Sequence, residues 1–238
     1  MQSHLFKKKL VFETDGFMEI IADIQNDYKE KFGIPRQSGL SPNVISKIIF
    51  RKEYRVKEAL MGLSEYSHLW ILWDFNLLKK NSWSPTVRPP VLGGNKRVGV
   101  FATRSPNRPN SIGLSCVKIE KISYDEKDSP IIYVSGADMA DGTPVYDIKP
   151  YIPYADCIPD AVGSFSDSYK DEKCAVIYDD RVFEGVKEDI KDNIIDILSL
   201  NPCPRYIDDN NRVFGMTFGD WEIKFTSDGN TVKVISVM

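Results

Sequence analysis

Between Phe17 and about Tyr151 the chain alternates short hydrophobic runs with segments rich in Gly, Pro and Asn. Within these runs, apolar and polar residues alternate with the period of two that places side chains on opposite faces of a strand. The pattern predicts strands over residues 18–25, 44–50, 69–75, 98–104, 112–124 and 131–139, and one short helix over 55–63. Several short strands at modest spacing are typical of a barrel or a sandwich.

A second unit follows a stretch rich in Pro, Ser, Gly and Asp, which we interpret as a linker. After it, a helix is predicted over 186–200, because apolar residues recur at the spacing of one helix face: Val186, Ile190, Ile194, Ile197 and Leu198. Prolines 202 and 204 end this helix. Residues 213–238 then alternate, with turn signals at 219–220 and 228–230, which predicts two or three strands. We therefore expect a small α+β domain packed on the β-rich one.

Composition narrows the class of protein. The 238 residues are 42% hydrophobic and 27% charged, and the sequence shows neither a signal-peptide core nor an apolar run long enough to span a membrane. The four cysteines are scattered and there are two histidines, so we expect reduced thiols and no structural zinc. These features predict a soluble cytoplasmic protein without a bound metal.

Charge is distributed unevenly along the chain. Residues 79–121 contain nine Lys or Arg and one acid, Glu120, whereas residues 156–238 contain seventeen acids and nine bases. The asymmetry favours a localised anionic partner, although two solvated surfaces of different charge would give the same count.

The basic segment includes an unusual loop, "TRSPNRPN". Pro106 and Pro109 restrict the backbone, so the loop has little conformational freedom to lose on binding a ligand. Arg104 and Arg108 carry planar, permanently charged groups suited to a carboxylate, a phosphate or an aromatic face. The loop is either a preformed ligand site or a proline-rich turn with solvated arginines.

Acidic residues gather around the turn "DGTP". They are Asp138, Asp141, Asp147 and Asp156, and they could bind a metal ion, accept hydrogen bonds from ribose hydroxyls or include a general base. For Asp141 the alternative is local, because Asp-Gly is a turn dipeptide whose carboxylate accepts from nearby N–H groups.

A third loop, "EKFGIPRQSGL", presents Arg36 and Gln37. The glutamine offers a donor and an acceptor, as adenine recognition requires, and the arginine suits an anion. His68 and the two tryptophans of "SHLWILW" are interpreted as core residues, with Trp70 and Trp73 on opposite faces of a strand. The usual glycine-rich phosphate loops and nucleophile elbows are absent from the sequence.

Four segments together carry a resemblance: "KFGIPRQSGL", "SHLWILWDF", "VRPPVLGGNKRVGVFATRSPNRPNSIGLS" and "DGTPVYDIKPYIPYAD". In this order they resemble the motifs of the TrmO (TsaA-like, YaeB-like) family of tRNA N6-methyladenosine methyltransferases. The resemblance runs from about Phe17 to Asp160 and continues more weakly to the end of the chain. It implies a single-sheeted antiparallel β-barrel that binds S-adenosylmethionine over residues 12–160, a linker over 161–184 and a small α+β domain over 185–238.

The resemblance also implies site residues. Cofactor contacts are expected at Pro35, Arg36, Gln37, Asn76, Leu77, Arg104, Leu114, Ser135, Gly136, Ala137 and Asp138. Substrate contacts are expected at Arg108, Lys149, Arg205 and Tyr206. The chain departs from the family pattern at two places: members commonly have histidine where this chain has Asn76, and "DPRPAY" where it has "NPCPRY" over residues 201–206.

The implied reaction is methylation of N6 of N6-threonylcarbamoyladenosine beside the anticodon of a threonine tRNA, by a homodimer. The carbonyl on the acceptor nitrogen delocalises its lone pair, so a base would help, and we expect Asp138 or Asp141 in that role. Two alternatives stay open: a noncatalytic RNA-binding barrel of the same ancestry, and a metal-dependent hydrolase built on Asp138, Asp141 and Asp147.

Overall fold

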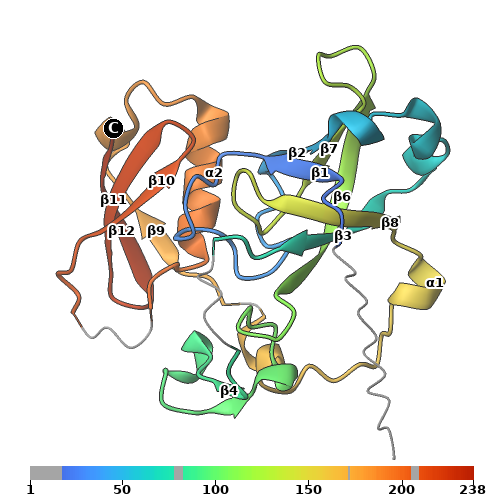
Figure 1. Cartoon of the computed structure of the whole chain (residues 1–238). Helices are drawn as coiled ribbons and strands as arrows, with labels where there is room; N and C mark the ends of the chain where they lie inside the picture. The colour runs from blue at the N-terminus through green and yellow to red at the C-terminus, as the bar shows by residue number, and fades with distance from the viewer. Residues whose placement is uncertain (1–17, 78–82, 171, 205–208) are drawn as a thin grey trace, which may run out of the picture.

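The computed structural model describes residues 18–77, 83–170, 172–204 and 209–238. Its described residues form two lobes that lie side by side (Figure 1), a β-barrel and a smaller sheet covered by one long helix. The prediction of a mainly β protein with an antiparallel barrel and a small α+β unit is confirmed. No helix within the described ranges is long and apolar enough to cross a membrane.

The barrel is a single closed sheet in which every neighbouring pair of strands is antiparallel. In spatial order its strands are β1 (Ala22–Gln25), β2 (Ile45–Phe50), β7 (Ile131–Ser135), β6 (Ile112–Ser123), β3 (His68–Asp74) and β8 (Pro144–Pro150). Alternate residues point inward: in β3, Leu69, Ile71 and Trp73 are buried, while Trp70 lies on the outer face. The predicted separation of Trp70 and Trp73 is confirmed.

The second lobe is a four-stranded sheet packed against a helix. The strands, in spatial order, are β10 (Phe214–Phe218), β11 (Trp221–Ser227), β12 (Thr231–Val237) and β9 (Ala175–Ile177), and β9 runs parallel to β12. The helix α2 (Glu188–Ser199) buries Ile194, Ile197 and Leu198 in the core of this lobe. β9 lies in the segment that we expected to be a linker, because three residues between polar neighbours carry too short a pattern to identify a strand.

The barrel lobe also bears a small hairpin and several short turns. The hairpin pairs β4 (Thr86–Val87) with β5 (Val98–Gly99), and a single-turn helix α1 (Pro153–Asp156) follows the barrel. Turns of 3-10 helix occupy Lys52–Tyr54, Lys57–Leu60, Leu63–Glu65, Pro90–Leu92, Val100–Ala102, Ser164–Tyr169 and Asp180–Phe183.

Three sequence predictions for the barrel are corrected. The strand predicted over 98–104 ends at Gly99, because Val100 faces Pro85, which has no N–H to extend the ladder. The helix predicted over 55–63 is two 3-10 turns separated at Gly62, whose φ is +81°. β8 was not predicted, because prolines stand at both of its ends and Asp147 interrupts its apolar pattern.

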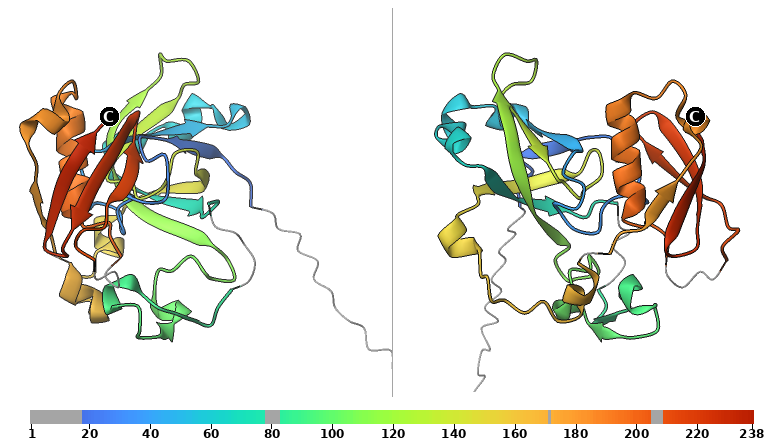
Figure 2. Two further views of the ribbon diagram at one scale, coloured as in Figure 1. Left: turned by 90° about the vertical axis from the view of Figure 1, so that its left-hand side faces the viewer. Right: turned by 180° about the vertical axis from the view of Figure 1, so that it is seen from behind.

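The segment between β1 and β2 joins the two lobes. Phe32 stacks against Phe214 and Phe225 of the second lobe, with ring centroids 6.3 Å from each. Tyr28 packs edge-on against Phe218, and the two residues form an isolated β-bridge. The loop that continues to residue 40 is therefore supported by both lobes, which lie close together in both views of Figure 2.

Candidate active site

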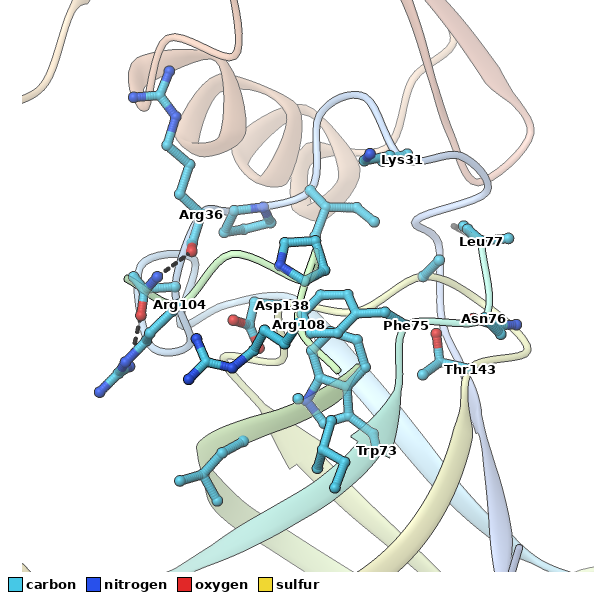
Figure 3. Close-up of a pocket in the computed structure, with 18 of the residues that line it drawn as sticks. Lys31, Arg36, Trp73, Phe75, Asn76, Leu77, Arg104, Arg108, Asp138 and Thr143 are labelled. Carbon is cyan, nitrogen blue, oxygen red and sulfur yellow. Dashed lines mark hydrogen bonds between the residues drawn. The ribbon is translucent and has the colours of Figure 1, made fainter. Parts of the chain in front are cut away.

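A pocket of about 420 Å³ opens at the end of the barrel that faces the second lobe. Four segments far apart in sequence line it: the loop after β1, the end of β3 with the residues after it, the loop that leads into β6 with the start of that strand, and the loop between β7 and β8 (Figure 3). The lining residues include Pro35, Arg36, Gln37, Asn76, Leu77, Arg104, Arg108, Leu114 and Asp138. The structure thus brings together eight of the eleven residues expected to contact the cofactor, and one expected to contact the substrate.

The loop before β6 is held by its own hydrogen bonds. Thr103 Oγ1 donates to the carbonyl of Val100 at 2.8 Å and accepts from the Ser105 N–H at 3.1 Å. Ser111 Oγ donates to the carbonyl of Pro106 at 3.0 Å. With two prolines and these bonds the loop is preformed, as its sequence predicted.

Arg108 is part of this internal framework. Its Nη1 donates to the carbonyls of Val100 and Thr103 at 3.0 and 2.6 Å, and its guanidinium lies over the ring of Phe101. The same side chain also lines the pocket. One end of its guanidinium is therefore committed to shaping the loop.

Arg104 connects two of the four segments. Its Nη1 donates to Gln37 Oε1 at 2.6 Å, and Gln37 Nε2 donates to the carbonyl of Arg36 at 2.6 Å. Arg36 in turn donates from Nη2 to the carbonyl of Asn201 in the second lobe, at 3.0 Å. Figure 3 shows Arg104 and Arg36 on the same side of the pocket, with the Arg36 guanidinium pointing away from the cavity toward the second lobe, so Arg104 and Arg108 supply the charge of this wall and Arg36 ties it to the second lobe.

The opposite wall is aromatic. Trp73 and Phe75 pack with ring centroids 4.2 Å apart, and Ile112 and Leu114 also line the pocket. Gly113 lies opposite Trp73 in the β3–β6 pairing, and a Cβ at this position would come within 2.1 Å of the indole ring. Glycine here allows the ring to lie flat on the strand.

A hydrogen-bonded chain links this wall to Asp138. Trp73 Nε1 donates to Ser115 Oγ at 2.9 Å, and Ser115 Oγ donates to Asp138 Oδ1. Burial raises the pKa of Asp138 from 3.8 to about 6, while the hydrogen bond from Ser115 and the charge of Arg104 lower it. The carboxyl is thus mostly ionised at neutral pH and able to take up a proton, as a general base must.

The three residues before Asp138 do not line the pocket. Ser135 Oγ donates to Glu120 Oε1 at 2.6 Å, away from the cavity, and Ala137 is buried in the barrel core. The carbonyl of Gly136 accepts from the Gly39 N–H at 2.8 Å, which fixes the first loop to the end of β7. β7 ends at Ser135 and the chain turns at Gly136, whose φ is +80°, so that Asp138 is the residue of this stretch that lines the pocket.

The remaining predicted residues lie elsewhere. Asp141 pairs with Lys29 Nζ at 3.0 Å and accepts from the N–H of Asn26 at 3.0 Å, so its carboxylate contacts the segment that follows β1 rather than N–H groups of its own Asp-Gly turn. Lys149 pairs with Asp147 at 2.8 Å on β8 and does not line the pocket. Arg205 and Tyr206 lie outside the described residues.

Several pocket residues were missed or given other roles. Trp73 was assigned to the core, and Ser115, Thr143 and Lys31 were not singled out, although Trp73, Thr143 and Lys31 line the pocket and Ser115 binds Asp138. Strand alternation signalled Ser115, because Gly113, Ser115 and Val117 share the inner face of β6. Lys31 has no comparable signal.

The charges of the lining indicate the kind of ligand. Four basic residues, Lys31, Arg36, Arg104 and Arg108, line the pocket together with one carboxyl, Asp138, and of the four the charge of Arg104 acts on that carboxyl. Across the described ranges, His, Cys, Asp and Glu side chains nowhere form a group of three placed to hold a metal ion. The aspartates required for the metal-dependent hydrolase are also separated, because Asp138 faces the pocket whereas Asp141 and Asp147 pair with lysines.

Known proteins share both lobes. Residues 23–157 match the family model of the tRNA-methyltransferase O N-terminal domain, and residues 178–238 match that of the TrmO C-terminal domain. The tRNA (adenine(37)-N6)-methyltransferase of Escherichia coli K12 is 40% identical over 209 residues, covering 85% of this chain and 88% of that protein. The enzyme of the same name from Eikenella corrodens is 37% identical, over 73% of this chain and 97% of that protein.

Solved structures extend the likeness to three dimensions. TrmO from Pseudomonas aeruginosa superposes with a TM-score of 0.73 at 29% identity, covering 93% of this chain and 98% of that one. Two family models that together span both lobes, a relative at 40% identity and this shared fold agree. The chain belongs to the TrmO family of tRNA methyltransferases.

Proposed function

We propose that this protein transfers a methyl group from S-adenosylmethionine to the N6 nitrogen of an adenine in tRNA. One observation carries the proposal: a cationic wall, an aromatic wall and a single ionisable carboxyl meet in one pocket. The relatives named tRNA (adenine(37)-N6)-methyltransferase support it.

The side chains present fit this cofactor. Arg104, held by Gln37, offers N–H donors to the carboxylate of its amino-acid part. Trp73, Phe75 and Leu114 offer apolar surface to an adenine ring. The volume is within the roughly 300–1,000 Å³ typical of small-molecule sites. When bound, S-adenosylmethionine supplies a methyl group already activated by a sulfonium.

Because the methyl group is activated, the protein's contribution is to position the acceptor and exclude water. Holding two reactants in line is worth up to ~7–11 kcal/mol of barrier. The preformed loop and the Trp73–Ser115–Asp138 chain provide fixed walls for that purpose. Asp138 Oδ2 is the atom to which we assign uptake of the proton from the acceptor nitrogen.

The finer proposal concerns the substrate. We infer that the adenine carries a threonylcarbamoyl group, whose carboxylate suits the cations at the pocket, Lys31 and the uncommitted end of Arg108. The carbamoyl carbonyl makes the N6 proton more acidic, so a carboxylate base of pKa about 6 is strong enough to assist its removal.

The test is methylation with labelled S-adenosylmethionine and two tRNA preparations, with and without the threonylcarbamoyl group, analysed by nucleoside mass spectrometry. We expect label only on the modified adenosine. Label on unmodified adenosine would overturn the finer proposal and keep the broader one. Saturable RNA binding with no cofactor binding by calorimetry would instead support the noncatalytic RNA-binding barrel.

Three further expectations belong to this proposal. A homodimer, a cytoplasmic location and the choice of a threonine tRNA stay predictions.

Asn76 lies at the pocket edge beside Leu77 (Figure 3), where an amide takes the place of the imidazole common in the family.

A further inference from the structure

An exposed aromatic pair lies beside the pocket. The rings of Trp83 and Phe101 stack with centroids 6.5 Å apart and an angle of 22° between their planes. Trp83 is 50% exposed and Phe101 is 71% exposed. Large flat apolar side chains are usually buried, so two of them stacked in solvent mark a contact surface.

The pair is held in place before any partner binds. Phe101 stands in the 3-10 turn Val100–Ala102, whose first N–H donates to the carbonyl of Pro85 at 3.0 Å. The guanidinium of Arg108 lies 5.5 Å from the Phe101 ring centre, and its Nη1 is fixed by two carbonyls. Next to Trp83, the Ser84 N–H donates to the carbonyl of Asn107 at 3.3 Å.

The surroundings of the pair are cationic. The hairpin of β4 and β5 carries Arg88, Lys96 and Arg97, and the sequence has no Asp or Glu between Trp83 and Val117. Figures 1 and 2 show this hairpin projecting from the lower side of the barrel lobe. Flat aromatic faces among cations are the combination that binds unpaired nucleic-acid bases, since the bases stack and the cations meet the phosphates.

The pair is also continuous with the pocket. Arg108 both lines the pocket and covers Phe101, and Thr103 and Arg104, two and three residues after Phe101, line the pocket as well. A base on the aromatic pair would therefore belong to a nucleotide close to the one that enters the pocket.

We propose that Trp83 and Phe101 form a stacking platform for an unpaired RNA base neighbouring the adenosine that is methylated. The proposal rests on the proposed function, because it takes the occupant of the pocket to be an adenosine of RNA. It adds a second point of attachment for the RNA loop, outside the reaction site.

The test measures binding of an anticodon stem-loop RNA to the full-length protein and its Phe101→Ala, Trp83→Ala and Phe101→Tyr variants by fluorescence anisotropy. Loss of one base–aromatic stack predicts affinity weakened roughly 5- to 100-fold in the alanine variants. Phe101→Tyr, which keeps the ring, should bind like the parent. A fully paired duplex without a loop should show no such penalty, and calorimetric affinity for S-adenosylmethionine should stay within about twofold.

Salt dependence separates stacking from charge. Arg97→Ala should reduce the slope of log K against log salt by about 0.7–1, through loss of a phosphate contact, whereas Phe101→Ala should leave the slope unchanged. An equal fall of the slope in Phe101→Ala would overturn stacking, since the ring would then act only by positioning cations.

Three other results would overturn the stacking platform of Trp83 and Phe101. Alanine variants that bind the stem-loop like the parent, while the parent methylates tRNA, would overturn the platform alone. A parent that binds no RNA would overturn both the platform and the proposed function. A change of oligomeric state in the alanine variants with unchanged RNA affinity would assign the pair to a protein interface and overturn the platform. Circular dichroism checks that each variant is folded.

Discussion

At the scale of single residues, Asp138 combines three properties of a catalytic base. It faces the pocket, it accepts a hydrogen bond from Ser115, and burial raises its pKa to about 6. Asp141, the other candidate, pairs with Lys29 and satisfies a backbone N–H. The structure thus distinguishes the two carboxyls that the sequence offered as candidates for the base.

Replacement of Asp138 should separate activity from stability. Asp138→Asn removes the base, so we expect kcat to fall by roughly 10²–10⁴. In the parent, kcat should rise with pH through about 6 as the carboxyl ionises. Since the folded pKa lies above the unfolded one, the folded state binds more protons, and its stability falls as pH rises from about 4 to 6.

The asparagine variant should therefore be more stable than the parent at pH 7.5, by on the order of 3 kcal/mol, and gain little near pH 4. Urea unfolding at the two pH values measures this difference. Asp141→Asn is the control, with kcat expected to change only a few-fold. Equal losses of kcat in both variants would contradict the assignment of the base.

Sequence reasoning at this scale succeeded where a residue type is unusual for its position. Arg104 is a charged residue in a proline-rich loop between two predicted strands, and the structure places it at the pocket with Gln37. It was less successful for Ser135, Gly136 and Ala137, because β7 ends at Ser135 and the backbone turns at Gly136, whose φ is +80°. Local sequence does not state which of them faces a cavity formed by another loop.

At the scale of elements, the pairing of β3 with β6 builds the aromatic wall. Opposite Trp73 the register places Gly113, and the next inward residue, Ser115, receives the indole N–H. Alternation predicted both strands from the sequence. It did not predict their register, which depends on contacts between residues about 40 positions apart.

Gly113→Ala tests this wall. The added Cβ would come within 2.1 Å of the Trp73 ring, so the ring must move. Overpacking of this kind costs about 1–3 kcal/mol, and we expect a matching loss of stability in urea together with a lower kcat. Gly99→Ala is the matched control, because a Cβ there meets nothing within 4 Å. Equal stability of both variants would show that the wall tolerates displacement of the ring.

At the scale of the whole molecule, the two lobes share the loop that carries Pro35, Arg36 and Gln37. Phe32 stacks on the second lobe just before this loop, and within the loop Arg36 donates to the carbonyl of Asn201. The sequence predicted both lobes from their periodicities. It could not predict that the first loop belongs to the packing of both, since the relevant rings lie about 190 residues apart.

The rings of Phe32, Phe214 and Phe225 stack across the two lobes, so we expect the lobes to unfold as one cooperative unit. We expect a single heat-absorption peak, which saturation of the pocket with S-adenosylmethionine at 100 times its Kd shifts upward as a whole, by about 2.7 kcal/mol of unfolding free energy. Phe32→Ala should lower the melting temperature and split the peak, with only the barrel's part responding to ligand. A ligand shift that remains common to both parts would show that another contact carries the coupling.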